Sequence, residues 1–206
     1  IALVARSEEN LREVAAGIAA GGGRAEALPA DLTESGRPAS MVAEAAARLG
    51  GLDIVVNVAG VSRRSDPIDI SNDDIDLAID LKLRASVEIT KAAVPLLRER
   101  GGGSIIFISG LSHVHTHVFH GSGCIPNAAL AAYKHQLAKR VAPDGIRVNM
   151  VNPGATATPR MARQTKRASE LTGKTIDEVK AKRLAAIPRG RFVSADDIAT
   201  TVLYLV

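Results

Sequence analysis

Aromatic residues and cysteine are scarce in this sequence of 206 residues, which has no tryptophan and one cysteine. Aromatic residues make up only 2% of the chain, so a core must be built from Ala, Val, Leu and Ile. One cysteine excludes a disulfide scaffold and a cysteine-based zinc site. No apolar run reaches the ~18 residues of a membrane span, and residues 1–4 are too short for the core of a signal peptide. We therefore expect a cytoplasmic protein with no membrane contact.

The charge of the chain is nearly balanced, with 26 basic and 22 acidic residues and a net charge of +4. The sequence contains no zinc-finger spacing, no aromatic motif for RNA stacking and no uniformly basic helix, so we expect no binding to nucleic acid. A mildly basic chain suits small anionic molecules, such as dinucleotides or acyl thioesters. The length favours a single domain over residues 1–206.

Short runs rich in β-branched residues alternate with longer amphipathic runs rich in alanine. The predicted strands are Ile1–Ala5, Arg24–Pro29, Ile54–Asn57, Ser104–Ser109 and Arg147–Asn152. The predicted helices are Glu8–Ala20, Ser40–Leu49, Ser71–Arg100, Asn127–Val141 and Ala195–Val206, with Ser7 and Ser194 as N-caps. This alternation predicts an α/β fold with a doubly wound parallel sheet.

Residues 155–191 contain no predicted strand and are strongly basic. They carry ten Lys and Arg residues against three Asp and Glu residues. One interpretation is a solvated helical excursion. The other is a mobile lid on the substrate side that faces an anionic ligand.

Several short motifs follow one another in a characteristic order. They are Asp31-Leu32, Asn57-Val58-Ala59-Gly60, Gly145-Ile146-Arg147-Val148-Asn149, Asn152-Pro153-Gly154 with Thr158, Ile187-Pro188-Arg189-Gly190-Arg191, and Ser194-Ala195-Asp196-Asp197-Ile198-Ala199. Each motif alone is weak, but the ordered set resembles the short-chain dehydrogenase/reductase family over essentially the whole chain. The resemblance implies a Rossmann-type, three-layer sandwich that holds NAD(H) or NADP(H) at the carboxyl ends of the strands.

The resemblance also implies which residues bind the cofactor. The segment Asp31-Leu32 matches the place where a carboxylate lies near the adenine. Residues matching the turn beside the adenosine ribose are Asn57, Ala59 and Gly60, and those matching the loop beside the nicotinamide carboxamide are Pro153, Gly154 and Thr158. The alternative is that these are ordinary turns between strands and helices, which also favour Asn, Gly and Pro.

Arg6 bears on the choice between NADP(H) and NAD(H). An NAD-specific enzyme of this type ends its second strand with a carboxylate that holds the ribose hydroxyls. Here that position is Ala5, and Arg6 follows it. A guanidinium there suits the 2′-phosphate of NADP, so NADP(H) is the expected cofactor, unless Arg6 is an ordinary surface charge.

The family's opening strand and its glycine-rich phosphate loop would precede Ile1. In this fold the opening strand lies in the middle of the sheet, and without it two strands would stand about 9.6 Å apart, with unpaired backbone groups on both. We therefore expect the sequence to be an internal portion of a longer protein.

The family's four catalytic residues, an Asn, a Ser, a Tyr and a Lys, are not matched. Counting back from residues 142–145 puts the Lys position at Asn127 and the Tyr position at Gly123. The Ser position falls on Gly110 and the Asn position on Asp80. Ser109 is one residue from the expected serine and can substitute for it, but the Tyr–Lys pair, which exchanges the substrate proton, has no obvious replacement.

Histidines gather in the same region, at His113, His115 and His117. In an extended segment these alternating side chains would project to one side, where one of them could donate the substrate proton. Two other interpretations remain open, a Zn²⁺ site and a polar surface loop. The lone Cys124 is either a thiol nucleophile or a small buried filler.

Three functions fit these observations. The first is an oxidoreductase that acts on an alcohol or carbonyl with an altered set of acid and base groups. The second is an inactive family member that keeps the cofactor in a structural or regulatory role, and the third is a histidine-dependent lyase or hydratase that uses no redox chemistry. The partner is a small, possibly anionic substrate. The resemblance implies that the helices matching Ile75–Leu97 and Asn127–Val141 pair across a subunit interface, so we expect a homodimer or homotetramer. The second of these helices carries an apolar stripe that suits such a contact, made by Leu130, Tyr133, Leu137 and Val141.

Overall fold

The computed structural model describes residues 1–63, 65–116 and 120–206. Strand β1 (Ala2–Ala5) pairs with β2 (Glu26–Pro29), and β4 (Gly103–Ile108) pairs with both β3 (Ile54–Asn57) and β5 (Ile146–Val151). All three pairings are parallel. The prediction of a parallel sheet is confirmed, and each predicted strand lies within two residues of the observed one.

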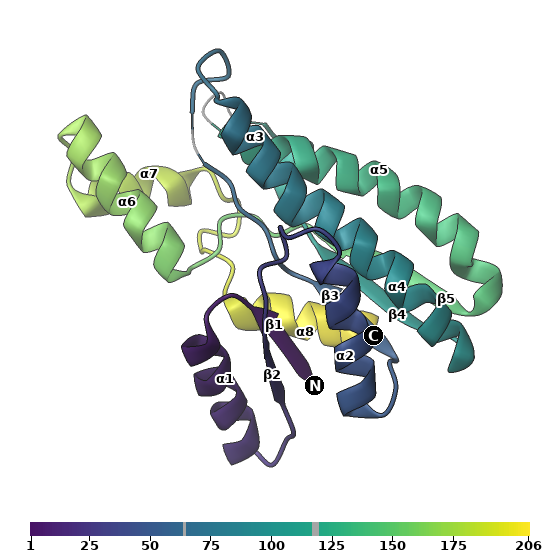
Figure 1. Ribbon diagram of the computed structural model, residues 1–206. Coiled ribbons are helices and arrows are strands. Elements are labelled where there is room, and N and C mark those ends of the chain that lie inside the picture. Colours follow the sequence, from purple (N-terminus) through teal and green to yellow (C-terminus); the bar gives the residue numbers. More distant parts are fainter. Residues whose placement is uncertain (64, 117–119) are drawn as a thin grey trace.

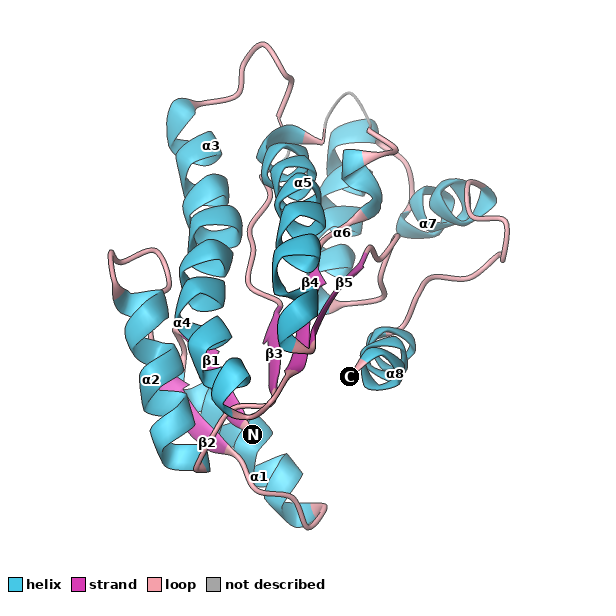
Figure 2. Ribbon diagram, turned by 90° about the vertical axis from the view of Figure 1, so that its right-hand side faces the viewer, coloured by secondary structure: helices cyan, strands magenta, loops and turns pink. Residues whose placement is uncertain are grey.

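Helices cover both faces of these strands (Figure 1; Figure 2). The helices α2 (Arg37–Leu49), α4 (Ala85–Glu99) and α5 (Cys124–Val141) lie on one face, and α1 (Glu8–Ala20) and α8 (Ala195–Leu205) lie on the other. This arrangement confirms the doubly wound α/β fold. Ser7 and Ser194 cap α1 and α8 as predicted, each by accepting a hydrogen bond from a backbone N–H three residues on.

The long helix predicted over residues 71–100 is divided by a change of helical pitch. It consists of α3 (Asn72–Ala78), a π-helical turn η1 (Ile79–Arg84) and then α4. A π-helical turn inside an α-helix shifts the following side chains around the axis and often marks a functional site. This turn includes Asp80 and Lys82, both of which bear on the site described below.

The core is aliphatic, as the composition predicts, with Phe107 at its centre. The Phe107 ring is fully buried and packs edge-on against Tyr133, with ring centroids 6.2 Å apart. Leu130 and Val141 of α5 are also fully buried, and Leu137 packs against the same cluster. The apolar stripe of α5 therefore faces this chain's own sheet, and its interpretation as a surface between subunits is wrong.

The two sets of strands are separated by an apolar slot. No described strand pairs with β1 on the side of β3, and a cavity of about 710 Å³ lies between them, lined by Leu3, Val4, Ile54, Val55 and Val56 among others. Ile54 and Val56 are partly exposed there. The slot lies where the resemblance places the family's opening strand.

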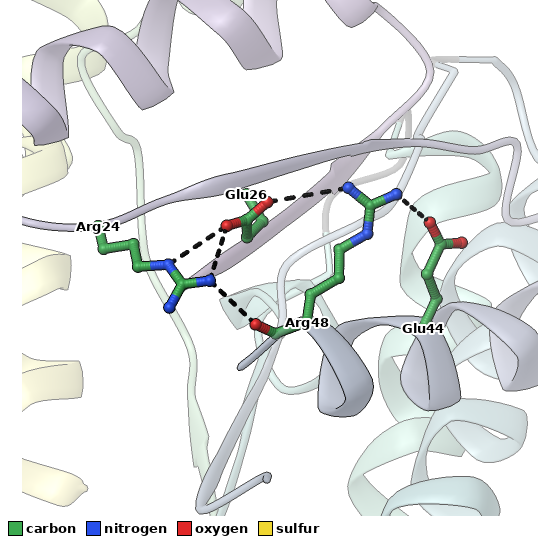
Figure 3. A network of polar contacts seen from close by, with 4 residues as sticks. All are labelled: Arg24, Glu26, Glu44 and Arg48. Carbon is green, nitrogen blue, oxygen red and sulfur yellow. Dashed lines mark hydrogen bonds and ion pairs between the residues drawn. The ribbon is translucent and has the colours of Figure 1, made fainter. Parts of the chain in front are cut away.

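Polar contacts join β2 to α2 at the end opposite the carboxyl ends of the strands. The Glu26 carboxylate lies 3.1 Å from Arg24 and 3.8 Å from Arg48, and Arg48 also pairs with Glu44 at 2.6 Å (Figure 3). The Arg24 guanidinium donates a further hydrogen bond to the Arg48 carbonyl. Because these side chains are largely exposed, the network orients the elements more than it stabilises them.

Residues 155–191 form two helices that project from the sheet, α6 (Pro159–Thr172) and α7 (Ile176–Ala185) (Figure 1). Thr158 caps α6, and Thr175 and Glu178 form a reciprocal capping box at the start of α7. Within the described ranges, every helix is too short or too polar to cross a membrane.

Candidate functional site

The carboxyl ends of parallel strands are where an α/β sheet binds its ligands. At the ends of β1 and β2, Arg6 lies close enough to Asp31 to lower the pKa of its carboxyl group. The larger cause of this lowered pKa is hydrogen bonding, because Asp31 accepts bonds from the Thr33 backbone N–H at 2.9 Å and the Thr33 hydroxyl at 2.7 Å. The structure thus brings together two residues that the sequence predicts for cofactor binding. The side chain of Leu32 packs instead in the core beneath them, so only its backbone is available to a ligand.

At the end of β3, the Asn57 amide is buried and lacks a hydrogen-bond partner among the described residues. The Oδ1 atom of Asn152, just after β5, is buried without a partner in the same way. Buried polar groups are rarely left unpaired, so these atoms are able to pair with a polar ligand at this edge of the sheet. This observation fits a dinucleotide, whose ribose hydroxyls and amide group can pair with them.

Gly60 follows Asn57 and Ala59 and lies against the side chain of Lys82. A Cβ atom on Gly60 would lie 2.8 Å from the Nζ atom of Lys82, so a larger residue there would require the lysine to move.

The Pro153–Thr158 loop is held in place by its own hydrogen bonds. The Pro153 carbonyl accepts a bond from the Leu111 N–H at 3.2 Å, and the Gly154 carbonyl accepts one from the Thr156 hydroxyl at 3.1 Å. The Thr158 hydroxyl accepts the Met161 N–H at 3.3 Å to cap α6. Thr158 thus has a structural task besides the predicted contact with the cofactor.

A short polar chain occupies the place of the family's Ser and Lys. The Ser109 hydroxyl donates to the Asn127 Oδ1 atom at 3.0 Å, and the Asn127 Nδ2 atom donates to the Ser112 hydroxyl at 2.8 Å. A Cβ atom on Gly110 would lie 3.2 Å from that same Nδ2 atom. Ser112 is not among the residues predicted from the sequence, because only the fold brings it beside Asn127.

The place of the family's tyrosine is filled by a neighbouring loop. A Cβ atom on Gly123 would lie 2.4 Å from both the Cβ and the Oγ atoms of Ser62. Reciprocal bonds fix this contact, since the Arg63 N–H donates to the Ser122 hydroxyl at 3.3 Å and the Ser122 N–H donates to the Arg63 carbonyl at 3.1 Å. Ser62 thus occupies the space that a side chain at position 123 would need.

Asp80 and Lys82 behave differently although both lie in η1. The Asp80 carboxylate forms an ion pair with Arg84, one turn further along the helix, at the helix surface. Lys82 is buried, and its ammonium donates to the Ile108 carbonyl at 2.9 Å. Burial lowers the pKa of Lys82 from 10.5 to about 8, with a smaller contribution from Arg160. Lys82 is not among the residues predicted from the sequence, although it lies four residues after the buried Ala78 and four before the buried Ser86.

The prediction that three histidines alternate along an extended segment is wrong for the described part of that segment. Leu111–His113 forms a 3₁₀ turn, and the His113 Nδ1 atom lies 2.8 Å from the Gly110 carbonyl oxygen. His115 is exposed, and His117 lies outside the described residues. No cluster of three potential metal ligands occurs in residues 1–63, 65–116 and 120–206. Cys124 donates a weak bond to the Gly121 carbonyl at 3.4 Å.

Comparison with known proteins agrees with this architecture. A family model described as "Enoyl-(Acyl carrier protein) reductase" matches residues 1–206. The short-chain reductase protein NovJ of Streptomyces niveus is 26% identical over 205 residues, which are 100% of this chain and 76% of NovJ. The chain belongs to the short-chain dehydrogenase/reductase family.

Two further members of the short-chain dehydrogenase/reductase family are similar to this chain. D-beta-hydroxybutyrate dehydrogenase of Rhizobium meliloti is 29% identical over 178 residues, covering 86% of this chain and 69% of the relative. The crystal structure of L-sorbose reductase from Gluconobacter frateurii, complexed with NADPH and L-sorbose, superimposes with a TM-score of 0.93. It is 28% identical, and the match covers 100% of this chain and 79% of the reductase.

Proposed function

We propose that this family member transfers a hydride between NADP(H) and a small molecule that carries a carbonyl or alcohol group. The observation that carries the proposal is the unpartnered, buried amide of Asn57 at the carboxyl end of β3, the edge where an α/β sheet binds its ligands. The related sorbose reductase, crystallised with NADPH and a sugar, supports both the cofactor and the class of substrate.

Each part of the cofactor is assigned to a group of residues that the sequence predicts. Arg6 binds the 2′-phosphate, with Asp31 and Leu32 near the adenine. Asn57, Ala59 and Gly60 bind a ribose, and Pro153, Gly154 and Thr158 bind the carboxamide. The bound nicotinamide supplies or accepts the hydride.

The chain itself must orient the substrate and manage its proton. Ser109 is held by Asn127 at the end of β4 and is placed to orient the substrate oxygen. His113 is the leading candidate for the proton donor, because its Nδ1 contact with Gly110 orients the ring and leaves Nε2 for the substrate. His115 and His117 are the other imidazole candidates. The Asp80 carboxylate pairs with Arg84, so we assign it no direct contact with the substrate.

Residues 155–191, which include the helices α6 and α7, form the proposed lid of the single domain over residues 1–206. The excess of positive charge in this segment favours a substrate that carries a negative charge. We also propose a homodimer or homotetramer in the cytoplasm. Its subunit contacts lie elsewhere than the buried face of α5, and light scattering at micromolar concentration tests this assembly.

Transfer of deuterium tests the reaction directly. The purified protein is incubated with NADPH deuterated at C4 and a panel of aldehydes, ketones and oxo acids, and the products are analysed by mass spectrometry. We expect deuterium in the alcohol formed from at least one carbonyl. Cofactor binding without any transfer would point to an inactive, cofactor-binding member, and turnover that consumes no nicotinamide would point to a lyase or hydratase.

Replacing Arg6 tests the choice of cofactor. We expect Arg6→Ala to remove most of the preference for NADP(H) over NAD(H), roughly 1.5–3 kcal/mol for a lost charged hydrogen bond. The measurement is the dissociation constant of each cofactor by calorimetry. Arg12→Ala is the matched control, because Arg12 is an exposed arginine on α1 that pairs with Glu8. Equal preferences before and after the Arg6 substitution would identify Arg6 as a surface charge.

A further inference from the structure

Lys82 is the one charged residue among the described residues that is buried, with 8% of its surface exposed. It lies in the π-helical turn η1, on the row of buried positions that includes Ala78, Ser86 and Thr90. A lysine on the core-facing side of a helix is costly, because its ammonium loses water without gaining a carboxylate.

The ammonium of Lys82 has three N–H donors and uses one of them. Its one hydrogen bond within the described ranges goes to the Ile108 carbonyl, and no carboxylate there pairs with it. Burial, and to a lesser degree the positive charge of Arg160, lowers the pKa of Lys82 to about 8. Two donors on a buried cation are thus left for a group that the protein itself does not provide.

The position of the ammonium indicates what that group is. Ile108 is the last residue of β4, and Gly60 lies just beyond the end of β3, so the Nζ atom sits between the ends of two neighbouring strands. Gly60 comes so close to Nζ that any side chain on it would collide with the ammonium. The unpartnered amide of Asn57 lies in the same turn, three residues earlier.

We propose that Lys82 binds the nicotinamide cofactor, donating its two remaining N–H groups to ribose hydroxyl oxygens of the nucleotide lying on Gly60. The role rests on the proposed function. In this role Lys82 supplies the site with a positive charge from η1. The position of the family's lysine on α5 is held by the neutral Asn127. The alternative is a structural role, in which Lys82 merely ties η1 to the end of β4.

The two roles predict opposite effects of Lys82→Met, which keeps the length of the side chain and removes the charge. If Lys82 binds the cofactor, the dissociation constants of NADP⁺ and NAD⁺ rise about 10- to 100-fold. The melting temperature without cofactor rises at the same time, on the order of 5 °C, because an uncompensated buried charge is gone. A structural tether predicts a lower melting temperature and unchanged dissociation constants. Lys91→Met, at an exposed position of α4, is the matched control and should change neither quantity.

Chemical modification of the unaltered protein gives an independent test, should Lys82→Met fail to fold. Acetic anhydride acetylates neutral amines, and the extent at each lysine is read by peptide mass spectrometry at pH 8. We expect saturating NADP⁺ to slow acetylation of Lys82 at least tenfold and to leave Lys91 unaffected. Equal acetylation of Lys82 with and without NADP⁺ would overturn the role, as would binding by Lys82→Met within twofold of the unaltered protein.

Failure of the proposed function gives a different result. If the unaltered protein binds neither NADP⁺ nor NAD⁺ at millimolar concentration, the proposed function is wrong and the role of Lys82 is wrong with it. If the unaltered protein binds and Lys82→Met binds equally well, only the role of Lys82 is wrong.

Discussion

Restoring the family's catalytic pair, by combining Gly123→Tyr with Asn127→Lys, is expected to unfold the protein rather than to activate it. The Cβ atom of any residue at position 123 would stand 2.4 Å from two atoms of Ser62, and two hydrogen bonds between the adjacent Arg63 and Ser122 hold this loop in place. Even Gly123→Ala should cost about 1–3 kcal/mol, since the loop must move away from η3 (Gly121–Gly123).

Urea unfolding followed by circular dichroism measures this cost. Gly17→Ala provides the control, because Gly17 lies inside α1 with open space around it, and alanine there should stabilise by about 0.5–1 kcal/mol. Adding Ser62→Gly should recover part of the stability lost by Gly123→Ala. If Gly123→Ala unfolds at the same urea concentration as the unaltered protein, the contact with Ser62 is not the obstacle that we describe.

Removing the proton donor is expected to have the largest effect on activity. His113→Gln should lower kcat roughly 10²- to 10⁴-fold in the reduction of a carbonyl, because the oxygen that receives the hydride electrons is left without its proton.

His135→Gln is the matched control, because His135 is an exposed histidine on α5. Tyr133→Phe should also have little effect, since Tyr133 packs against Phe107 in the core. His115→Gln and His117→Gln are measured in parallel, and loss of activity in one of these would move the role to that residue. Full activity in all three variants would exclude His113, His115 and His117 as the proton donor.

Local sequence patterns were sufficient for the architecture of this protein and for its family. Runs rich in β-branched residues favour strands, and amphipathic runs rich in alanine favour helices. Their alternation therefore predicted the parallel strands to within two residues. Ser7 and Ser194 were recognisable as caps because capping needs only a side-chain oxygen three residues before an N–H group. The order of the short motifs pointed to the family, and counting along it revealed that Gly123 and Asn127 replace the Tyr–Lys pair.

Only the tertiary structure decided what surrounds those positions. Ser62 contacts Gly123, and Ser109 and Ser112 both bind Asn127. These contacts join segments that are separated in the sequence, so local patterns do not predict them. The stripe on α5 was visible in the sequence, but helical periodicity marks an apolar face without saying whether the sheet or a second subunit covers it. The burial of Lys82 was likewise decided by the tertiary structure. Its contacts with Ile108 and Gly60 follow from how η1 packs over the ends of β3 and β4.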